Sequence, residues 1–230
     1  MRLAIVIPVL DEAQTIEASL RALAPLRARG ATVIVVDGGS GDSTPALASP
    51  LADRVLASAR GRSMQMNAGA RCEEAAAADV LLFLHADTRL PDDADRVVQQ
   101  ALADGRRCWG RFDVRLDAPG WQLRLIETMI NWRSRLTGIA TGDQAIFATR
   151  AAFNRLGGFA PLPLMEDLDF SRRARRLGRP RALRERVITS ARRWQQHGVW
   201  RTVLLMWRLR AAYFLGADPA QLARRYRDAR

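Results

Sequence analysis

The sequence predicts an α/β fold with a mostly parallel central sheet flanked by helices and a helical extension at the C-terminus. Short, nearly continuous apolar runs alternate with segments of helical periodicity along much of the chain, as in parallel sheets covered on both faces. The 230 residues, 48% apolar and 26% charged, suffice for one large core. We therefore expect a main domain over residues 1–195 and a basic helical extension over residues 196–230.

The first part of the chain predicts a regular alternation of strands and helices. Apolar runs of strand length, several of them rich in β-branched residues, lie at residues 3–9, 32–37, 53–58 and 79–85. Helical spacing between them predicts helices from Asp11, as a cap, to about Leu23, and over residues 63–77 and 91–104. This order of elements favours parallel strands joined by helical crossovers.

The pattern after residue 105 is less regular. Residues 108–116 alternate between apolar and polar side chains, which predicts a half-exposed strand. Further strands are expected at residues 144–150 and 182–189, and helices at residues 120–136, 166–178 and 199–216, before a short capped tail.

The charge of the chain is concentrated near its C-terminus. All 36 basic residues are arginine, and the net charge is +12. Residues 171–230 hold 17 arginines and 3 acidic residues, whereas residues 1–170 hold 19 arginines and 21 acidic residues. Such a basic segment could contact nucleic acid, an anionic membrane surface or a phosphorylated substrate. It could equally reflect an arginine-rich composition on solvated helices.

Cysteines and apolar segments limit the class of protein. Cys72 and Cys108 are far apart and form no CxxC motif, which argues against a disulfide framework and a structural zinc site. The apolar run near the N-terminus is short and is broken by Pro8, so we expect no signal peptide. No segment approaches the roughly 18–20 apolar residues of a membrane span. We expect a cytoplasmic protein.

Charged side chains follow several of the predicted strands. Glu12 follows the first strand, Asp37 ends the second, Arg62 follows the third, and His85 and Asp87 follow the fourth. Ligands of open α/β sheets bind at the carboxyl ends of the strands, so we expect these side chains to meet at one edge. Carboxylates, an arginine and a histidine together would suit a nucleotide diphosphate with a bound metal ion.

The glycine-rich turn after the second strand has two interpretations. Asp37-Gly38-Gly39-Ser40 could contact a ligand, or it could be a tight turn that caps a helix. The chain lacks GxGxxG after a strand, which argues against a dinucleotide-binding dehydrogenase, and it lacks GxxxxGK[ST], which excludes a P-loop.

His85 and Asp87 are two positions apart at the end of a predicted strand. Residues i and i+2 of an extended chain point to the same side, so both could face one ion. A carboxylate with phosphate oxygens suits Mg²⁺ or Mn²⁺, and an imidazole nitrogen favours Mn²⁺. Alternatively, His85 is not a ligand and Asp87 caps the turn before Pro91.

Glu166 and Asp167 form a second group of carboxylates, at the start of a predicted helix. The positive end of the helix dipole stabilises negative charge there. One of the two could serve as a general base. Simple helix capping is the alternative, and Asp169 is expected to be structural.

Together these motifs resemble the family-2 glycosyltransferases of GT-A fold, which transfer a sugar from a nucleotide-sugar donor with inversion. The resemblance runs in order through the segments "IVIPVLDEAQTI", "VIVVDGGSGDST", "RGRSMQMNAGA", "VLLFLHADTRLP", "GDQAIFATRAAFNRLGGF" and "MEDLDFSRR". More narrowly, "LHADTRLP", "TGIATGDQAIF" and "SARRW" resemble the bacterial radical-SAM/selenodomain-associated transferase subgroup.

The resemblance implies a GT-A-like, nucleotide-sugar-binding catalytic domain over residues 1–195. Pro8 and Glu12 would line the nucleotide pocket, and Asp37 would bind the base, most often uracil. Arg62 and Asn67 would approach the base and phosphates of the donor. A UDP-sugar is therefore the expected donor.

The resemblance also implies a metal site and a base. Asp87 corresponds to the last Asp of the DxD metal motif, and Asp167, with Glu166 beside it, corresponds to the catalytic base. The first Asp of DxD is replaced here by His85, so the metal geometry of the family does not transfer unchanged. His197 is a candidate for a further metal ligand, since some GT-A enzymes use a late histidine.

The stretch "SARRW" resembles the QxxRW element of processive members, but Ser190 stands where glutamine is expected. This substitution and the lack of membrane spans argue against a processive polysaccharide synthase. Arg193 and Trp194 remain candidates for contact with the diphosphate or the acceptor. Asp143 is the alternative base if Asp167 is not the base.

The sequence thus predicts an inverting, metal-dependent glycosyltransferase that uses Mn²⁺ or Mg²⁺. The competing interpretations are a sugar-phosphate nucleotidyltransferase, which would carry a Gly-rich loop after the first strand, and a non-catalytic basic module that binds nucleic acid or membrane. Nucleic-acid binding is disfavoured because it leaves both carboxylate groups unexplained. The sugar, the acceptor and the oligomeric state are not defined by the sequence.

The helix at residues 199–216 has three interpretations. Its apolar residues could pack on the catalytic body, could form a dimer contact, or could lie on the inner face of a membrane beside a lipid-linked acceptor. The residues concerned are Val199, Trp200, Val203, Leu204, Trp207 and Tyr213. Arg201, Arg208 and Arg210 would suit phospholipid head groups.

Overall fold

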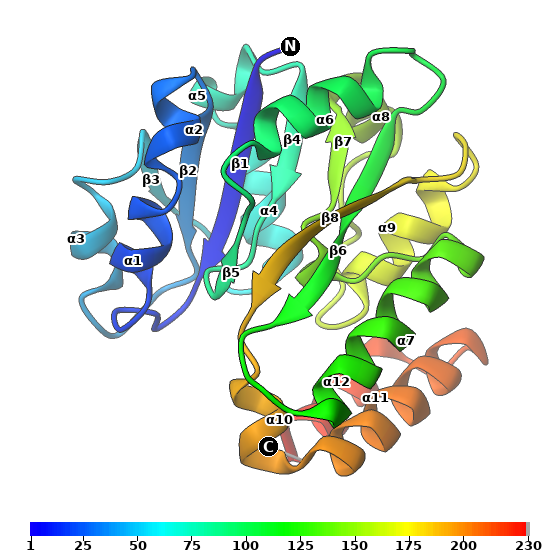
Figure 1. Cartoon of the computed structure of the whole chain (residues 1–230). Helices are drawn as coiled ribbons and strands as arrows, with labels where there is room; N and C mark the ends of the chain where they lie inside the picture. The colour runs from blue at the N-terminus through cyan, green and yellow to red at the C-terminus, as the bar shows by residue number, and fades with distance from the viewer. Residues whose placement is uncertain (229–230) are drawn as a thin grey trace.

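A single mixed sheet runs through the protein, with helices on both of its faces (Figure 1). The computed structural model describes residues 1–228, and the side chains of all of these except Arg193, His197, Arg227 and Asp228. The sheet has the strand order β3-β2-β1-β4-β7-β6-β8-β5. Its strands are β1 (Leu3–Val9), β2 (Thr32–Asp37), β3 (Arg54–Ala57), β4 (Val80–Phe83), β5 (Thr88–Arg89), β6 (Trp109–Leu116), β7 (Phe147–Thr149) and β8 (Arg181–Thr189).

The helices lie between and after these strands. In chain order they are α1 (Ile16–Arg21), α2 (Ala24–Ala28), α3 (Thr44–Ala48), α4 (Arg62–Arg71), α5 (Glu73–Ala76), α6 (Ala94–Leu102), α7 (Trp121–Thr137), the 3-10 turn η1 (Gly142–Gln144), α8 (Arg150–Arg155), α9 (Glu166–Ala174), α10 (Arg192–His197), α11 (Val199–Phe214) and α12 (Pro219–Asp228).

Strands β3, β2, β1 and β4 are parallel, and β6 is parallel to β8. Strand β7 is antiparallel to both of its neighbours, and β5 pairs antiparallel with β8. The predicted architecture, a mostly parallel sheet flanked by helices with further helices at the C-terminus, is confirmed. Because β1, β2 and β4 run in the same direction, the residues that follow them reach one edge of the sheet.

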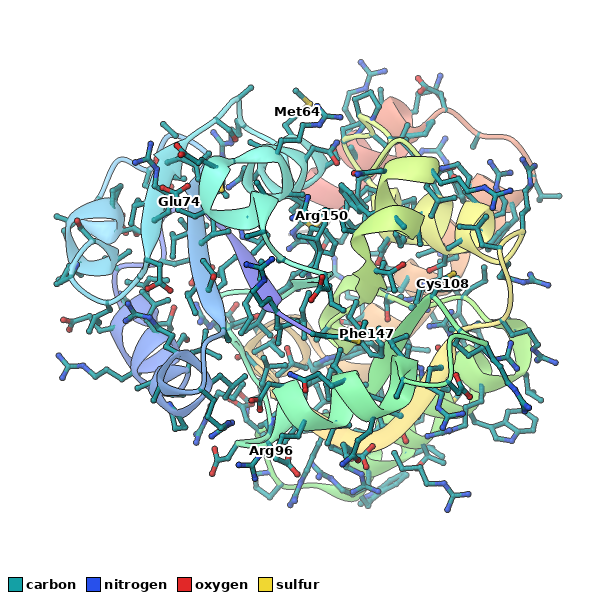
Figure 2. All side chains as sticks on the ribbon, turned by 90° about the horizontal axis from the view of Figure 1, so that it is seen from above. Met64, Glu74, Arg96, Cys108, Phe147 and Arg150 are labelled. Carbon is teal, nitrogen blue, oxygen red and sulfur yellow. The ribbon has the colours of Figure 1, made fainter. Side chains whose placement is uncertain are left out.

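Alternation along the strands divides the core into two layers. In β1, Leu3, Ile5 and Ile7 face α1, α2 and α6, whereas Ala4 and Val6 face α4, α8 and α9. Arg150, at the start of α8, donates to the carbonyls of Ala70, Ala75 and Ala78 and so ties α8 to the α4–α5 segment (Figure 2).

Helix α4 sits unusually close to the sheet because of one glycine. A Cβ at Gly69 would lie 2.5 Å from Cγ1 of Val6 and 2.8 Å from Cγ2 of Val36. Any larger residue would push α4 away from β1 and β2. This close approach holds the N-terminus of α4, with Arg62, beside the ends of the two strands.

Several predicted boundaries are wrong. The helix predicted from Asp11 to Leu23 begins only at Ile16, because Asp11 has a φ of 54° and accepts a hydrogen bond from the Gly41 amide instead of capping a helix. The strand predicted over residues 79–85 ends at Phe83. Strand β6 is almost entirely buried, because helices and neighbouring strands cover it, and is not half-exposed as predicted.

The C-terminal helices pack on the body of the protein through a few residues. Val203 of α11 joins a cluster with Leu116 and Ile126, and Leu209 joins one with Ile139. The predicted packing of α11 is therefore correct for Val203 and, as partly buried residues, for Val199 and Tyr213. Trp200, Leu204 and Trp207 are all more than half exposed. The division at residue 195 stays a prediction. No helix among residues 1–228 has both the length and the apolar character needed to cross a membrane.

Candidate functional site

A cavity of about 860 Å³ lies where the sheet edge meets α7, α9 and α11. Its lining combines residues that follow β1 and β4, the N-termini of α4 and α9, and one side of α7 and α11. Of the predicted site residues, it brings together Glu12, Arg62, His85, Asp87, Asp143, Glu166, Asp167 and Trp194. Except for Asp37, which does not line the cavity, the charged groups that we expected at one sheet edge therefore share this cavity with the carboxylates of α9.

The ends of β1 and β2 are organised by hydrogen bonds within their own loops. The backbone N–H of Glu12 donates to Oγ1 of Thr44 at 2.8 Å, which fixes Glu12 at the edge of the cavity. Both carboxylate oxygens of Asp37 accept bonds from the following turn, from the amides of Gly39 and Ser40 and the Ser40 hydroxyl. Asp37 thus stabilises a tight turn, which was one of the two interpretations of this glycine-rich segment. Its contact with the base of a nucleotide stays a prediction.

The N-terminus of α4 presents one side chain to the cavity. Desolvation lowers the pKa of Arg62, but the nearby carboxylates of Glu166, Asp167 and Asp87 outweigh it, so the pKa is raised overall. Arg62 therefore keeps its charge and links the two carboxylate groups electrostatically. Gln65, which the sequence did not single out, donates to the carbonyls of Val9 and Val36 at 2.7 and 2.8 Å and fixes α4 on the strand ends.

Pro8 and Asn67 do not line this cavity. Pro8 is buried within β1, paired with Val36 of β2. The Asn67 amide donates to the Phe159 carbonyl at 2.8 Å and accepts from the Phe159 N–H at 2.9 Å. Asn67 thereby positions the loop that leads to α9. The direct roles of both residues in donor binding stay predictions.

His85 lies against Gly142 of the η1 turn. A Cβ at Gly142 would lie 2.5 Å from Nε2 of His85, so only glycine leaves space for the imidazole. Burial, together with the charge of Arg62, lowers the pKa of His85 to about 3. The imidazole is therefore neutral at physiological pH, with a nitrogen lone pair available.

Asp87 follows His85 in a turn and not in an extended strand. The Thr88 N–H donates to the His85 carbonyl at 3.0 Å, which closes this turn, so the geometric argument from strand alternation is wrong. Both side chains nevertheless line the cavity. Burial raises the pKa of Asp87, and Arg62 opposes this shift.

Glu166 and Asp167 occupy the first turn of α9. Met165, the residue before the helix, has a φ of 69°, a strained left-handed conformation for a residue with a side chain. Both oxygens of Asp167 accept backbone bonds at 2.8 Å, from the N–H of Gly142 and of Leu168. Gly142 thus connects Asp167 to His85, and the carboxylate is held in one orientation.

The two adjacent carboxyl groups share a partly desolvated site. Burial, with the charge of Asp167, raises the pKa of Glu166 to about 7. Burial also raises the pKa of Asp167, against the effect of the Gly142 bond. A carboxylate whose pKa lies closer to neutrality is better matched to proton abstraction. Asp169, by contrast, pairs with Arg173 at 2.6 Å and is structural, as expected.

Of the remaining predicted site residues, some line the cavity and others have side chains that the structure does not describe. Oδ1 of Asp143 is buried and has no hydrogen-bond partner within residues 1–228. Trp194 and Ser190 line the cavity. The side chains of Arg193 and His197 lie outside those that the structure describes, so their predicted roles stay predictions.

The residues present fit a metal ion that a ligand helps to hold. In the described part of the chain, no three His, Cys, Asp or Glu side chains gather closely enough to hold a metal by themselves. A carboxylate, Asp87, and a neutral imidazole, His85, do line one cavity. In proteins that bind phosphate esters, Mg²⁺ is commonly coordinated by one or two carboxylates together with phosphate oxygens. This donor set suits Mn²⁺ or Mg²⁺ bound jointly with a diphosphate.

Sequence reasoning missed part of the lining. Arg133 of α7, Arg192 of α10 and Thr141 face the cavity and were not singled out. Arg210 of α11 was named from the sequence, but as a contact for phospholipid head groups, whereas its side chain lines the cavity.

The chain is similar to known proteins over much of its length. A family model described as "Glycosyl transferase family 2" matches residues 4–157. The succinoglycan biosynthesis protein ExoA of Rhizobium meliloti is 41% identical over 108 residues, which are 44% of this chain and 33% of that protein. The chain therefore spans about a third of the curated relative that it matches.

Solved structures share the fold at low sequence identity. TarS of S. aureus in complex with UDP-GlcNAc has a TM-score of 0.65 at 16% identity, over 83% of this chain and 58% of that chain. The mannosyltransferase PcManGT of Pyrobaculum calidifontis, with GDP-Man and Mn²⁺, gives 0.63 at 22%, over 92% and 61%. Glucosyl-3-phosphoglycerate synthase of Mycobacterium tuberculosis gives 0.59 at 20%, over 80% and 69%. These similarities confirm the predicted GT-A-like fold.

Proposed function

The chain belongs to glycosyl transferase family 2, and from this premise we propose that it transfers a sugar from a nucleotide-sugar donor to an acceptor with inversion. One observation carries the proposal: Asp87, which follows β4, and the Glu166–Asp167 pair of α9 open on one cavity of about 860 Å³. Arg62 interacts electrostatically with all three carboxylates. A site for donor phosphates and a site for a base are thus adjacent.

In this proposal Asp167 is the general base. It takes the proton of the acceptor hydroxyl while that oxygen attacks the anomeric carbon from the face opposite the nucleotide. Its orientation by the amides of Gly142 and Leu168 supports this role, because a fixed carboxylate loses little freedom on reaching the transition state. Asp143, whose Oδ1 is buried without a partner among residues 1–228, is the alternative base.

The donor diphosphate would lie near Asp87 and Arg62. Asp87 and the neutral His85 would hold Mn²⁺ or Mg²⁺, which supplies positive charge to the departing diphosphate when bound. Arg62 adds a second positive charge on the same side. The complexes of TarS with UDP-GlcNAc and of PcManGT with GDP-Man and Mn²⁺ support a nucleotide-sugar and a metal, though they differ in the nucleotide. We favour UDP because of the base-binding role that the resemblance implies for Asp37.

A panel of nucleotides and nucleotide-sugars, with Mn²⁺ or with a chelator, tests donor binding by thermal shift. Metal-dependent stabilisation by one nucleotide series supports the proposal, and the series identifies the base. A flat response to every nucleotide would contradict it. Membership of this family favours sugar transfer over the nucleotidyltransferase and the non-catalytic basic module. The radical-SAM/selenodomain-associated subgroup stays a prediction that rests on three sequence motifs.

We also propose that residues 196–230 bring the site to an anionic membrane surface on the cytoplasmic side, near a lipid-linked acceptor. Trp200 and Trp207 of α11 are 51% and 53% exposed, and Arg201 and Arg208 on the same helix are exposed as well. Sedimentation of the full chain with vesicles that contain anionic lipid tests this. Replacing both tryptophans with serine should reduce binding, whereas equal binding of both proteins would refute it.

A further inference from the structure

Two arginines with unused hydrogen-bond donors line the cavity beside the proposed base. Arg133 comes from α7 and Arg210 from α11. Nη2 of Arg133 and Nε of Arg210 are buried and have no hydrogen-bond partner within the described part of the chain. Buried polar atoms in folded proteins almost always have a partner, so these two donors are left for water or for a ligand that enters the cavity.

The two guanidinium groups lie close enough to affect each other. Burial, and then the charge of Arg210, lowers the pKa of Arg133 to about 10, so both remain protonated at neutral pH. Asp143 and Asp167 face Arg133 and oppose this shift. No ion pair joins either arginine to these aspartates among the side chains that the structure describes. Two adjacent positive charges without a counter-charge in contact favour binding of an anion.

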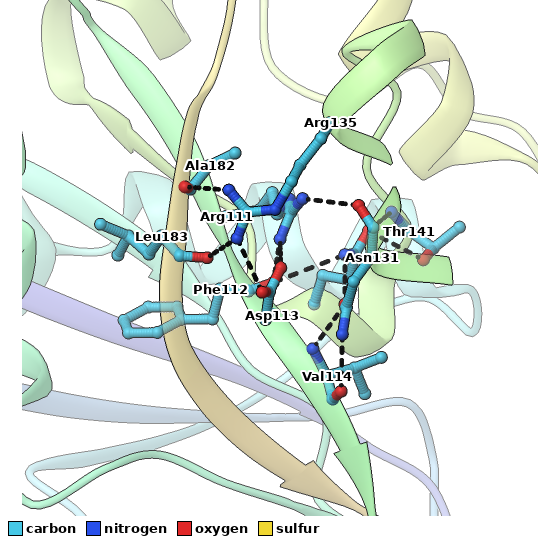
Figure 3. A network of polar contacts seen from close by, with 10 residues as sticks. Arg111, Phe112, Asp113, Val114, Asn131, Arg135, Thr141, Ala182 and Leu183 are labelled. Carbon is cyan, nitrogen blue, oxygen red and sulfur yellow. Dashed lines mark hydrogen bonds and ion pairs between the residues drawn. The ribbon is translucent and has the colours of Figure 1, made fainter. Parts of the chain in front are cut away.

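The helices that carry the two arginines are fixed in place. On one side of α7, Arg135 donates to Asp113 and to the carbonyls of Ala182 and Leu183 (Figure 3). Asn131 exchanges two hydrogen bonds with the backbone of Val114. These bonds fix the rotation of α7 about its axis.

The opposite side of α7, with Arg133, then faces the cavity. Helix α11 is fixed through the burial of Val203 and Leu209, which positions Arg210. The two arginines are therefore presented to the cavity by helices whose positions are fixed.

We propose that Arg133 and Arg210 form a subsite for a phosphate group of the acceptor, so that this transferase acts on an acceptor that carries a phosphate near the attacking hydroxyl. This inference rests on the proposed function. A phosphate monoester carries a charge of about −1.5 to −2 at pH 7 and three acceptor oxygens, which match two guanidinium groups better than a single carboxylate does. Because the two arginines lie beside Asp167, an acceptor whose phosphate binds them would have its hydroxyl next to the proposed base.

The position of the pair favours the acceptor over the donor. Arg210 acts on Asp167, whose pKa it lowers, whereas Arg192 acts on Asp87 at the end of β4, and Arg62 acts on Asp87 as well as on the carboxylates of α9. The side of the cavity near Asp87 thus has arginines of its own. The half-buried guanidinium groups of Arg133 and Arg210 lie on the side of the proposed base.

Apolar side chains surround the pair and bear on the source of the phosphate. Met129 and Trp132 of α7 and Trp207 of α11 line the same cavity. A lipid phosphate would place its hydrocarbon chain against these apolar side chains, whereas a soluble phosphate ester would bind through its phosphate alone. Both ligands share the phosphate group, and one probe for each distinguishes a lipid from a soluble ester.

The test uses the full chain, with UDP and Mn²⁺ in excess so that the donor site is filled. Glycerol 3-phosphate and octyl phosphate are titrated by calorimetry. Both should bind the wild type, and R133M and R210M should each weaken binding about tenfold or more, the usual effect of losing a charge-assisted hydrogen bond. If octyl phosphate binds at least about tenfold more tightly than glycerol 3-phosphate, the phosphate belongs to a lipid, because each buried methylene adds affinity. Equal affinities of the two probes indicate a soluble phosphate ester.

Arg96→Met is the matched control, because Arg96 is exposed on α6 and lies outside the cavity lining. It should bind both probes as the wild type does. The thermal midpoint of the free protein provides a second measurement. If the arginines serve a ligand, R133M and R210M should keep or raise the midpoint, because each removes one of two neighbouring like charges and a buried nitrogen without a hydrogen-bond partner.

Two results would overturn the subsite: neither probe binds the wild type, or both bind the R133M/R210M double variant with wild-type affinity. A lower midpoint in both single variants would also count against it, since it would indicate a structural role. Loss of nucleotide binding is a separate outcome. A protein that binds phosphate through Arg133 and Arg210 but binds no nucleotide would refute the proposed function and leave the subsite standing.

Discussion

The Glu166–Asp167 pair should make the stability of the free protein depend on pH near neutrality. Burial, with Asp167 beside it, raises the pKa of Glu166 from 4.5 to about 7. Between these values the folded protein holds a proton that the unfolded chain has released, so the free energy of unfolding falls as the pH rises. Each pKa unit is worth about 1.4 kcal/mol, so the whole interval corresponds to about 3 kcal/mol.

Replacing Glu166 with glutamine isolates this effect. At pH 5 the glutamine substitutes for a protonated acid, so the variant and the wild type should have nearly equal free energies of unfolding. At pH 8 the wild type carries a buried charge that the variant lacks, and the variant should be more stable by up to about 3 kcal/mol. Urea unfolding at both pH values, with a chelator and without nucleotide, measures the difference.

Glu185 provides the control, because it is exposed on β8. The Glu185→Gln variant should follow the wild type at both pH values. If Glu166→Gln and the wild type lose stability in parallel between pH 5 and pH 8, Glu166 does not hold the proton, and the reasoning from its burial fails.

Three further substitutions test the site. Asp167→Asn should lower the rate of transfer at least about a hundredfold while nucleotide affinity stays near that of the wild type, since only proton abstraction is lost; near-normal turnover would shift the role of base to Asp143. Asp87→Ala should abolish the Mn²⁺-dependent part of nucleotide stabilisation in thermal shift, and an unchanged metal response would remove Asp87 as a ligand. Gly142→Ala should lower the free energy of unfolding by about 1–3 kcal/mol, because its Cβ would lie 2.5 Å from His85; unchanged urea unfolding would show that the imidazole can move aside.

The donor half of the site could be predicted because its signals are local. Each of β1, β2 and β4 is a short apolar run, and the polar residue after it must reach the carboxyl edge of a parallel sheet. The Glu166–Asp167 pair could be named from the sequence because two carboxylates at a helix start are visible there, and the structure brings both to the same cavity; the role of Asp167 as base stays a prediction. Even here, local detail failed: His85 and Asp87 lie in a turn because the strand ends at Phe83, and strand periodicity does not reveal where pairing stops.

The other half could not be predicted because it depends on long-range packing. Nothing in the sequence near Arg133 distinguishes it from the many solvated arginines of this chain, and the apolar helix around Arg210 suggested a membrane contact and not a place in the cavity. They line the cavity only because Arg135 binds the backbone of β8 and Val203 packs against Leu116 of β6. The same holds for Asn67, whose amide is used by Phe159, 92 residues later in the chain.

The two sides of the cavity differ in how much of them the family match covers, and this difference bears on acceptor specificity. The family match covers residues 4–157, which include the proposed donor side, Glu12 to Asp87, and end before the proposed base and the C-terminal helices α10, α11 and α12. Arg210 and Trp207 therefore lie in a part of the chain where membership of the family gives no guidance. A shared donor site combined with a wall supplied by α9 and α11 is the arrangement expected if related transferases keep their chemistry and change their acceptor. If the subsite proposed above exists, Arg133, which lies within the matched residues, and Arg210, which lies beyond them, would together select the acceptor.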